Sequence, residues 1–260
     1  MKIISLNVNG IRAAARKGLY EWLAAQQADF VCLQEIRAQI HQLQNDPIYF
    51  PSNESVTYYD AVKPGYSGVA IYSKHQPTNI VRGLGFDTCD IEGRYLQFDY
   101  ANFSVVSVYF PSGSSGENRQ EIKYDFLDRF AQHVLKLQSA GKDLIFCGDF
   151  NIAHQARDLK NWRANQTHTG FLPEERAWMD YLFDKLGLVD AFRVKNQESD
   201  QYTWWSNRGQ AWAKNVGWRI DYQIISPSLA QLVTNVDIYR DTRFSDHAPL
   251  TVCYAGDNWF

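Results

Sequence analysis

The sequence predicts an α/β fold built as a four-layer sandwich, in which two packed mixed β-sheets are flanked by helices. Apolar runs rich in β-branched residues outnumber the amphipathic helical patterns. Several runs follow one another directly across short turns with Gly, Pro or Asn, whereas a βαβ barrel needs a helix after each strand. Because no long linker, repeat or charge block divides the chain, we expect residues 1–260 to form a single domain.

The expected strands share an apolar, β-branched composition and are bounded by polar or turn-forming residues. In chain order they are Ile3–Val8, Phe30–Leu33, Gly68–Tyr72, Arg94–Asp99, Phe103–Phe110, Leu144–Cys147, Ile220–Ile225 and Pro249–Tyr254. Three helices are expected. Leu19–Ala25 follows a glycine, Arg119–Gln138 is long and amphipathic, and Pro173–Leu186 begins with proline and two glutamates, which favour a first helical turn.

Composition places the chain among ordinary globular proteins, with 45% hydrophobic and 21% charged residues. No apolar run approaches the roughly 20 residues that a membrane-spanning helix needs, and the N-terminus turns polar too early for a secretory signal. The four cysteines form no CxxC pair, so we expect free thiols in the core of a cytoplasmic protein. A net charge of −3 means that a nucleic-acid partner would need cations clustered on one face.

Polar residues stand where the expected strands end or begin, and this is the most informative feature of the chain. They are Asn7, Gln34, Glu35, Tyr109, Asp149, Asn151, Asp221, Asp246 and His247. Polar groups beside core strands lower stability unless they are hydrogen-bonded or neutralised. If the strand ends converge, four carboxylates share one rim and require a cation. Oxygen ligands with one imidazole and no thiolate favour Mg²⁺ or Mn²⁺. Enzymes that hydrolyse phosphate esters commonly use such an ion to polarise a phosphoryl oxygen while a base activates water.

Each of these residues also has a purely structural explanation. Asn7 and Asn9 are typical turn formers before Gly10, and Glu35 would pair with Arg37. Tyr109 suits a core ring at a strand end. In the same way, Asp149 and Asn151 suit an Asx turn, Asp246 a loop cap and His247 a satisfied core histidine. The functional interpretation is preferred because it explains all the positions together.

Seven motifs, in order and at characteristic spacing, resemble those of the exonuclease III family. They are Leu6–Arg12, Leu33–Glu35, Gly65–Gly68, Val108–Pro111, Gly148–His154, Gly217–Tyr222 and Ser245–Pro249, and the match extends to about residue 254. That family comprises abasic-site (AP) endonucleases of base-excision repair, which have the DNase I-like endonuclease/exonuclease/phosphatase fold. The resemblance therefore implies the same fold and activity.

The resemblance also implies roles for the strand-end residues. Glu35 resembles the principal metal ligand, supported by hydrogen bonds from Asn7. The metal set is completed by Asp149, Asn151, Asp246 and His247. Among the catalytic residues, Asp149 resembles the acid or base and Asn151 a transition-state stabiliser worth on the order of 3 kcal/mol. Tyr109 resembles a phosphate contact, and the Asp221–His247 pair resembles a protonated donor to the phosphate, although a general-base role for the histidine stays open.

A segment rich in tryptophan and cations is the expected DNA face. It contains Trp204, Trp205, Arg208, Trp212, Lys214, Trp218 and Arg219, a composition suited to rings packing on sugars or bases and cations on phosphates. A core position suits Trp205 best. By resemblance, Trp204, Trp218 and Ile220 line a pocket for a flipped-out abasic sugar. By the same resemblance, Lys63 and Tyr66 lie on a loop that meets the DNA backbone and minor groove. Further phosphate candidates, each with a solvated surface charge as the alternative, are Arg12, Arg157, Lys160 and Arg163.

One segment departs from the family pattern. Many relatives carry paired asparagines, or Asn with Ser or Ala, before Gly-Phe, whereas residues 165–171 here read Asn-Gln-Thr-His-Thr-Gly-Phe. A bulky His168 at this place would obstruct a continuous duplex and favour 3′-end processing, or it would point to solvent. The balance of activities therefore stays open.

Together these observations predict a Mg²⁺-dependent DNA-repair phosphodiesterase, with Mn²⁺ as a substitute. It would hydrolyse the bond 5′ to abasic sites and process 3′ ends as a 3′→5′ exonuclease and 3′-phosphatase. The expected partner is double-stranded DNA with abasic sites or blocked 3′ ends, bound by a monomer with no membrane association, nucleoid-associated in a bacterium. Three alternatives are a same-fold phosphatase on a non-DNA phosphate ester, a 3′-end nuclease without AP incision, and a non-catalytic DNA-binding module.

Overall fold

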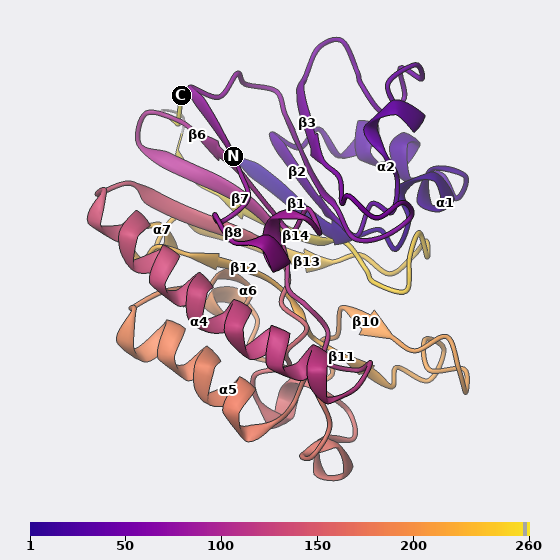
Figure 1. Ribbon diagram of the computed structural model, residues 1–260, viewed down its shortest axis with the longest axis vertical. Coiled ribbons are helices and arrows are strands. Elements are labelled where there is room, and N and C mark those ends of the chain that lie inside the picture. The colour runs from indigo at the N-terminus through magenta and orange to yellow at the C-terminus, as the bar shows by residue number, and fades with distance from the viewer. Residues whose placement is uncertain (257–258) are drawn as a thin grey trace.

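Two six-stranded sheets and a small hairpin form the framework of the computed structural model, which describes residues 1–256 and 259–260 (Figure 1). The first sheet has the strand order β13-β14-β1-β2-β4-β3, the second has the order β5-β6-β7-β8-β12-β9, and β10 pairs with β11. The strands are β1 (Lys2–Asn7), β2 (Phe30–Gln34), β3 (Ser55–Tyr59), β4 (Val69–Ser73), β5 (Asn79–Arg82), β6 (Tyr95–Asp99), β7 (Phe103–Tyr109), β8 (Asp143–Asp149), β9 (Val189–Asp190), β10 (Trp204–Trp205), β11 (Gly217–Trp218), β12 (Asp221–Ile225), β13 (Val233–Ile238) and β14 (Leu250–Tyr254). The helices are α1 (Ile11–Ala15), α2 (Leu19–Gln26), α3 (Asp87–Asp90), α4 (Glu117–Ser139), α5 (Pro173–Asp180), α6 (Ala191–Lys195) and α7 (Pro227–Ala230).

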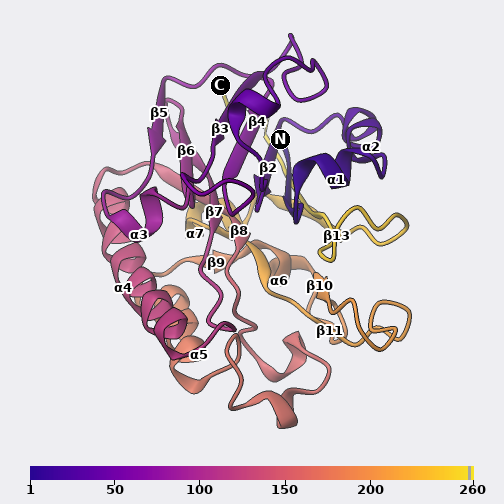
Figure 2. The same cartoon turned by 45° about the vertical axis from the view of Figure 1, so that its right-hand side comes forward.

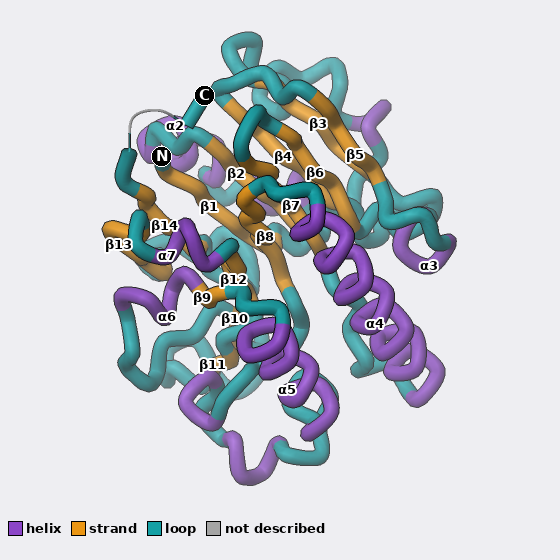
Figure 3. Tube along the Cα trace, turned by 90° about the vertical axis from the view of Figure 1, so that its left-hand side faces the viewer, coloured by secondary structure: helices purple, strands orange, loops and turns teal. Residues whose placement is uncertain are grey.

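Three hydrophobic clusters separate four layers, so the predicted sandwich is confirmed. Between the sheets, side chains of β1, β2 and β4 pack on those of β6, β7 and β8, with Phe30 and Phe103 among them. On the outer face of the first sheet, α1 and α2 cover Leu6 and Leu33. On the outer face of the second sheet, α4 and α5 cover β7 and β8, as Figure 3 shows from the side. This order of helices, sheet, sheet and helices buries both faces of each sheet's central strands.

Strand register brings the chemistry-bearing residues to one edge of the sandwich. The parallel pair β1–β2 sets Asn7 beside Gln34, one residue before Glu35. The parallel pair β7–β8 sets Tyr109 beside Asp149, and antiparallel β12 sets Asp221 opposite Asp149. Since the carboxyl ends of parallel neighbours meet at the same edge, the polar residues after these strands converge as predicted.

All eight expected strands form, with ends within about two residues of the prediction, but several elements were not predicted. Edge strands β5 and β13 have half of their residues exposed, and β13 contains a register shift, so neither has a continuous apolar pattern. Strands β9, β10 and β11 have two residues each, too few for a periodic signal. The third expected helix is α-helical only to Asp180 and continues as a wider π-helical turn over Tyr181–Lys185. Within residues 1–256 and 259–260, no helix is long and apolar enough to span a bilayer.

Candidate active site

A cavity of about 320 Å³ opens at the edge where β1, β2, β7 and β8 end. We call it the active-site cavity. Its lining includes nine of the predicted site residues: Glu35, Tyr109, Asp149, Asn151, Trp204, Trp218, Ile220, Asp246 and His247. It also includes Asn9, Arg37, Ser112, Ser114, Thr169 and Gly170, for which the sequence analysis proposed no catalytic or ligand-binding role. The predicted convergence of carboxylates, amides and one imidazole is therefore present.

Asn7 joins the two sheets beneath the cavity. Its buried Nδ2 donates to Glu35 Oε2 and to Asp149 Oδ2, both at 2.9 Å, and its Oδ1 accepts from the backbone N–H of Asn9. Because every polar atom of this amide is occupied, Asn7 orients the two carboxylates, as expected of a supporting residue. Glu35 also accepts from the guanidinium of Arg37, with Nε at 2.8 Å. The pairing with Arg37 that was the structural explanation for Glu35 is therefore present too.

Asp149 and Asn151 form an Asx turn, as their structural explanation predicted. The same turn places both side chains in the lining of the cavity. The Asn151 backbone N–H donates to Asp149 Oδ1 at 2.9 Å, with Asn151 in the left-handed region at φ 53°. Asn151 Nδ2 donates to the Phe110 carbonyl at 2.9 Å and is 3.4 Å from Asp149 Oδ2. That second contact is weak, so one amide hydrogen is available to a substrate oxygen.

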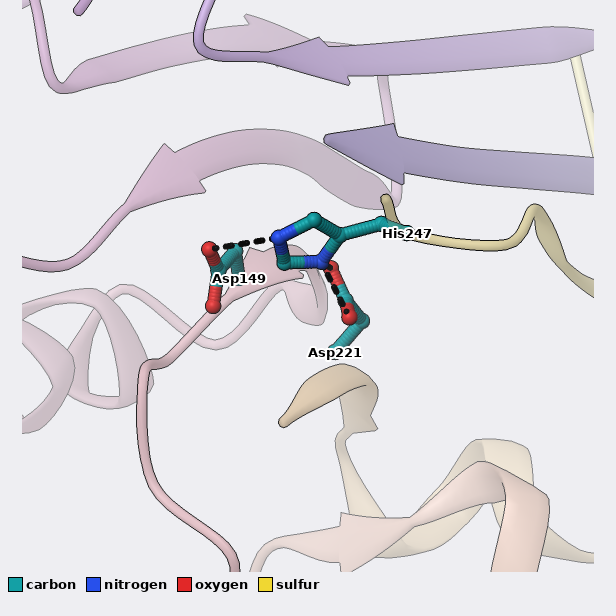
Figure 4. Close-up of side chains that lie close together, drawn as sticks. All are labelled: Asp149, Asp221 and His247. Carbon is teal, nitrogen blue, oxygen red and sulfur yellow. Dashed lines mark hydrogen bonds and ion pairs between the residues drawn. The ribbon is translucent and has the colours of Figure 1, made fainter. Parts of the chain in front are cut away.

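His247 lies between two buried aspartates, as Figure 4 shows. Its Nδ1 is 2.9 Å from Asp221 Oδ2, and its Nε2 is 3.8 Å from Asp149 Oδ2. Burial alone lowers the pKa of this imidazole, but Asp221 and Asp149 outweigh it and raise the pKa to about 10. A protonated ring donates from both nitrogens, so this geometry favours a donor role for His247 over metal ligation.

The pKa of Asp149 is raised above its usual range, mainly because the carboxylate is buried and secondly because Asp221 repels it, while His247 acts in the opposite direction. Asp149, Asp221 and His247 each offer an atom within 4.8 Å of the others, a spacing that suits a metal ion only with a neutral imidazole. Asp246 completes the rim, accepting from Asn9 Nδ2 at 2.8 Å and Trp204 Nε1 at 3.1 Å.

These donors fit a hard divalent cation. Three carboxylates, those of Glu35, Asp149 and Asp246, line one cavity. A bound cation would offset their mutual repulsion and the unfavourable free energy of burying Glu35 and Asp149 as anions. None of the four cysteines lines the cavity; three are buried and Cys253 is partly buried on β14. Which of the predicted metal residues bind the ion stays a prediction.

Tyr109 is anchored by a residue that the sequence analysis did not single out. The buried guanidinium of Arg94 donates to the Tyr109 carbonyl at 2.9 Å and lies 4.6 Å from the centroid of its ring. Burial first, and then Glu35, raises the pKa of the Tyr109 phenol, so the hydroxyl stays a proton donor. Arg94 also donates to the Tyr66 hydroxyl, which links the predicted DNA loop to the cavity.

An apolar wall faces the polar rim. Strands β10 and β11 place Trp204 opposite Trp218, with ring centroids 6.5 Å apart and nearly perpendicular. Ile220 packs behind them with Phe171. Trp205, in contrast, is fully buried beside Trp212, as the core alternative predicted. One expectation is wrong: Arg219 is not on the DNA face but is buried in ion pairs with Asp158 and Asp190.

The remaining predicted DNA contacts lie outside the cavity in the part of the chain that the structure describes. The exposed residues include Arg12, Lys63, Arg208 and His168. Arg208 lies on the loop between β10 and β11, which projects from the molecule in Figure 2. Lys63 lies 5.3 Å from the Tyr66 ring centroid. His168 precedes Thr169 and Gly170, which line the cavity, so it stands beside the opening. Their contacts with DNA stay predictions.

The fold and the site together define a class: a phosphoester hydrolase with acidic, amide and imidazolium groups at the edge of a two-sheet sandwich. The chain belongs to the endonuclease/exonuclease/phosphatase family, whose sequence profile matches residues 4–247. It is 39% identical over 253 residues to an exodeoxyribonuclease of Bacillus subtilis, covering 96% of this chain and 98% of the relative. It is 35% identical over 257 residues to the DNA repair nuclease APEX1 of Danio rerio, covering 98% and 82%.

A solved structure with the same fold is the 3′-5′ exonuclease NExo from Neisseria meningitidis. It superposes with a TM-score of 0.89 at 26% identity, covering 98% of this chain and 99% of that one. A further NExo structure from Neisseria is described as a 3′ phosphatase bound to a product DNA hairpin. The resemblance expected from the motifs is thus confirmed.

Proposed function

We propose that this protein is a Mg²⁺-dependent DNA-repair phosphodiesterase that hydrolyses the bond 5′ to abasic sites and also processes 3′ ends. Its relatives are DNA exonucleases and repair nucleases, and the chain is a hydrolytic nuclease of their family. The observation that carries the finer proposal is one cavity with two walls: a carboxylate–imidazolium rim that suits phosphate, and a Trp204–Trp218 wall that suits a sugar. We further propose a monomeric, single-domain, cytoplasmic enzyme in which Mn²⁺ can replace Mg²⁺.

Each residue has a definite task in this reaction. Glu35, Asp246 and Asp149 would hold the cation, with Asn7 orienting two of these carboxylates. A bound divalent ion supplies Lewis-acid polarisation of a phosphoryl oxygen. The His247 imidazolium, fixed by Asp221, presents Nε2–H to a phosphate oxygen. Asn151 Nδ2 and the Tyr109 hydroxyl add neutral donors where charge develops in the transition state.

Asp149 is suited to move the proton. Its position beside His247 and Asn151 allows it to take a proton from water or return one to the leaving oxygen. The apolar wall supports selectivity for abasic sites. A sugar without its base is cheap to extrude from the duplex, and it is small enough to pack against Trp218.

The first experiment is cleavage of three labelled DNAs, with Mg²⁺ and with EDTA: a duplex with one abasic analogue, a recessed 3′ end and a 3′-phosphate. We expect metal-dependent incision at the abasic site and metal-dependent 3′ processing. Incision that persists in EDTA would contradict the metal assignment. If all three DNAs stay intact while a soluble phosphate ester is hydrolysed, the same-fold phosphatase is the correct alternative.

A second candidate function is a 3′-end nuclease that does not incise abasic sites. It is favoured by the exposed His168 beside the cavity wall and by the likeness to NExo, which is named as a 3′-5′ exonuclease. The same three substrates separate the two functions, because this candidate predicts 3′ processing with no incision of the abasic duplex.

Trp218→Ala should raise KM for the abasic duplex about tenfold while kcat changes less than about threefold. The ring forms the wall against which the sugar packs but touches none of the proton-transfer groups, so its loss removes binding rather than chemistry. Steady-state kinetics measure the effect. Trp259→Ala is the control, because that ring packs on Phe103, at the end of β7 opposite to Tyr109. A fall in kcat with unchanged KM would contradict the wall's role.

A further inference from the structure

A fully buried ion pair lies outside the active-site cavity, between the two helices that cover the second sheet. Lys123 of α4 and Glu175 of α5 are both 0% exposed, and Lys123 Nζ is 2.5 Å from Glu175 Oε1. Figure 1 shows these helices running alongside each other. Burying two charges is unfavourable, and a well-packed apolar pair is often as stable or more stable. Stability alone therefore does not explain the pair.

Lys123 reaches the active site through the backbone. Its Nζ donates to the Asn151 carbonyl at 2.8 Å, so the ammonium bridges Glu175 and the turn that presents Asn151. Asn151 has φ 53°, a left-handed conformation that is unfavourable for most L-residues and that asparagine tolerates better than most. Lys123 thus holds the peptide group after Asn151, while the Asp149 carboxylate holds the one before it by accepting the Asn151 backbone N–H.

Glu175 holds the neighbouring wall of the cavity. Its Oε2 accepts from the backbone N–H of Gly170 at 2.6 Å and of Leu172 at 3.0 Å, and its Oε1 is 3.4 Å from Thr169 Oγ1. Thr169 and Gly170 line the cavity. A single buried carboxylate thus fixes both the start of α5 and the loop in front of it.

The loop held by Glu175 lies against both the Asn151 turn and the Trp218 ring. A Cβ built on Gly170, which has φ 90°, would lie 3.1 Å from the Asn151 carbonyl oxygen and 3.2 Å from Trp218 Cζ3. The Gly170 carbonyl also accepts from Ala153, two residues after Asn151. Gly170 therefore lies directly between Asn151 and Trp218. A shift of the loop would change the distance between the Asn151 side-chain amide and the Trp218 ring.

We propose that Lys123 and Glu175 are positioning residues of the nuclease reaction, which fix the Asn151 turn and the Thr169–Gly170 wall from outside the cavity. The inference rests on the proposed function for its kinetic consequence. Its structural consequence, the fixing of the turn and loop, is measurable without any activity. A misplacement of about 1 Å at a catalytic group is enough to lower a rate by up to about 10²-fold.

The test uses three variants of the full chain. In Lys123→Met/Glu175→Gln no unpaired charge is left buried, and the glutamine oxygen still accepts from the loop, but the donor to Asn151 is gone. Glu175→Gln alone keeps the Lys123 amine as a donor to the Asn151 carbonyl but removes its counter-charge, so it serves as the conservative variant under conditions where its thermal midpoint shows that it is folded. Arg129→Ala breaks an exposed ion pair with Asp125 on the same helix and is the control.

We expect kcat to fall about 10- to 100-fold in the double variant, with KM and DNA affinity within threefold of wild type. We expect Glu175→Gln to recover most of kcat, and Arg129→Ala to match wild type. Amide hydrogen exchange of residues 150–153 should rise in the double variant, with a smaller rise at 168–172, where a neutral glutamine oxygen is a weaker acceptor than the carboxylate, while the thermal midpoint shows that the fold is intact. An unchanged kcat and unchanged exchange in a folded double variant would overturn the proposal, as would an equal loss in Glu175→Gln.

Exchange also separates this proposal from the proposed function. If the wild-type protein cleaves no DNA, faster exchange confined to these two segments still supports the positioning role, and unaltered exchange overturns it. If the double variant does not fold, Lys123→Leu/Glu175→Gln, which keeps the acceptor for Gly170 and Leu172, replaces it with the same exchange readout at 150–153.

Discussion

Asp149→Asn should lower kcat for abasic-site cleavage at least about 10²-fold, while duplex affinity stays within a few-fold of wild type. Asparagine keeps the size of the side chain and can still accept from the Asn151 backbone N–H, but it cannot take up a proton. It also removes the charge that faces His247 Nε2 at 3.8 Å. Single-turnover kinetics measure the chemical step, and fluorescence anisotropy measures binding.

The matched control is Asp143→Asn. Asp143 begins the same strand, β8, at the end remote from the cavity, where it contacts Ser228. Wild-type kinetics are expected for it. A comparable loss of binding and rate in Asp149→Asn would show instead that this carboxylate maintains the structure, the Asx-turn role that the sequence also allows.

Asp158→Asn should lower the free energy of unfolding by about 3–5 kcal/mol, because it leaves buried guanidinium charge uncompensated. Asp158 Oδ1 accepts from Arg193 Nη2 at 2.6 Å and from Arg219 Nε at 2.8 Å, and Arg219 also pairs with Asp190 at 2.8 Å. Urea unfolding at pH 7 measures the effect. Asp200→Asn, in an exposed pair with Lys160, should change stability by no more than about 1 kcal/mol.

The ion pairs of Asp158 with Arg193 and Arg219 also predict that stability depends on pH. Burial alone would raise the pKa of Asp158, but Arg219 and Arg193 outweigh it and lower the pKa to about 2. An unfolded aspartate has a pKa of about 3.9, so the folded protein favours the ionised form and this stabilisation is complete above that pH. It is lost as the pH falls through about 2. The stability gap between wild type and variant should therefore narrow between about pH 4 and 2; a gap independent of pH would contradict the ion-pair account.

The fold was predictable because its central strands have strong local signals. Leu144–Cys147 is apolar throughout and Phe103–Phe110 is interrupted only by two small serines and Tyr109, since both faces of these strands are buried in the sandwich. Edge strands such as Val233–Ile238 are half exposed, so their patterns are weak and they were missed. The π-helical turn after Asp180 has no local sequence signal that distinguishes it from a continuing helix.

Supporting residues of the site were less predictable than its central ones. Arg94 is one cation in a strand-like segment and Lys123 is one of several in a helical segment, and only burial against Tyr109 and Asn151 distinguishes them from surface charges. Arg219 shows the opposite case. Its place in a Trp-rich basic segment suggested DNA contact, but strand geometry turns it away from the two flanking residues Trp218 and Ile220 and into the core.

By itself, the sequence determined the elements and the kinds of chemistry available, because hydrophobic periodicity and polar strand ends are local properties of the chain. The tertiary structure alone decided which side chains meet. Asn7 and Asp149 are 142 residues apart, yet they share a 2.9 Å hydrogen bond because two different sheets end at the same edge. The protonated state of His247 likewise depends on Asp221 and Asp149, brought within reach by the register of β12 on β8. Such long-range contacts follow from sheet packing and burial, which no local stretch of sequence specifies.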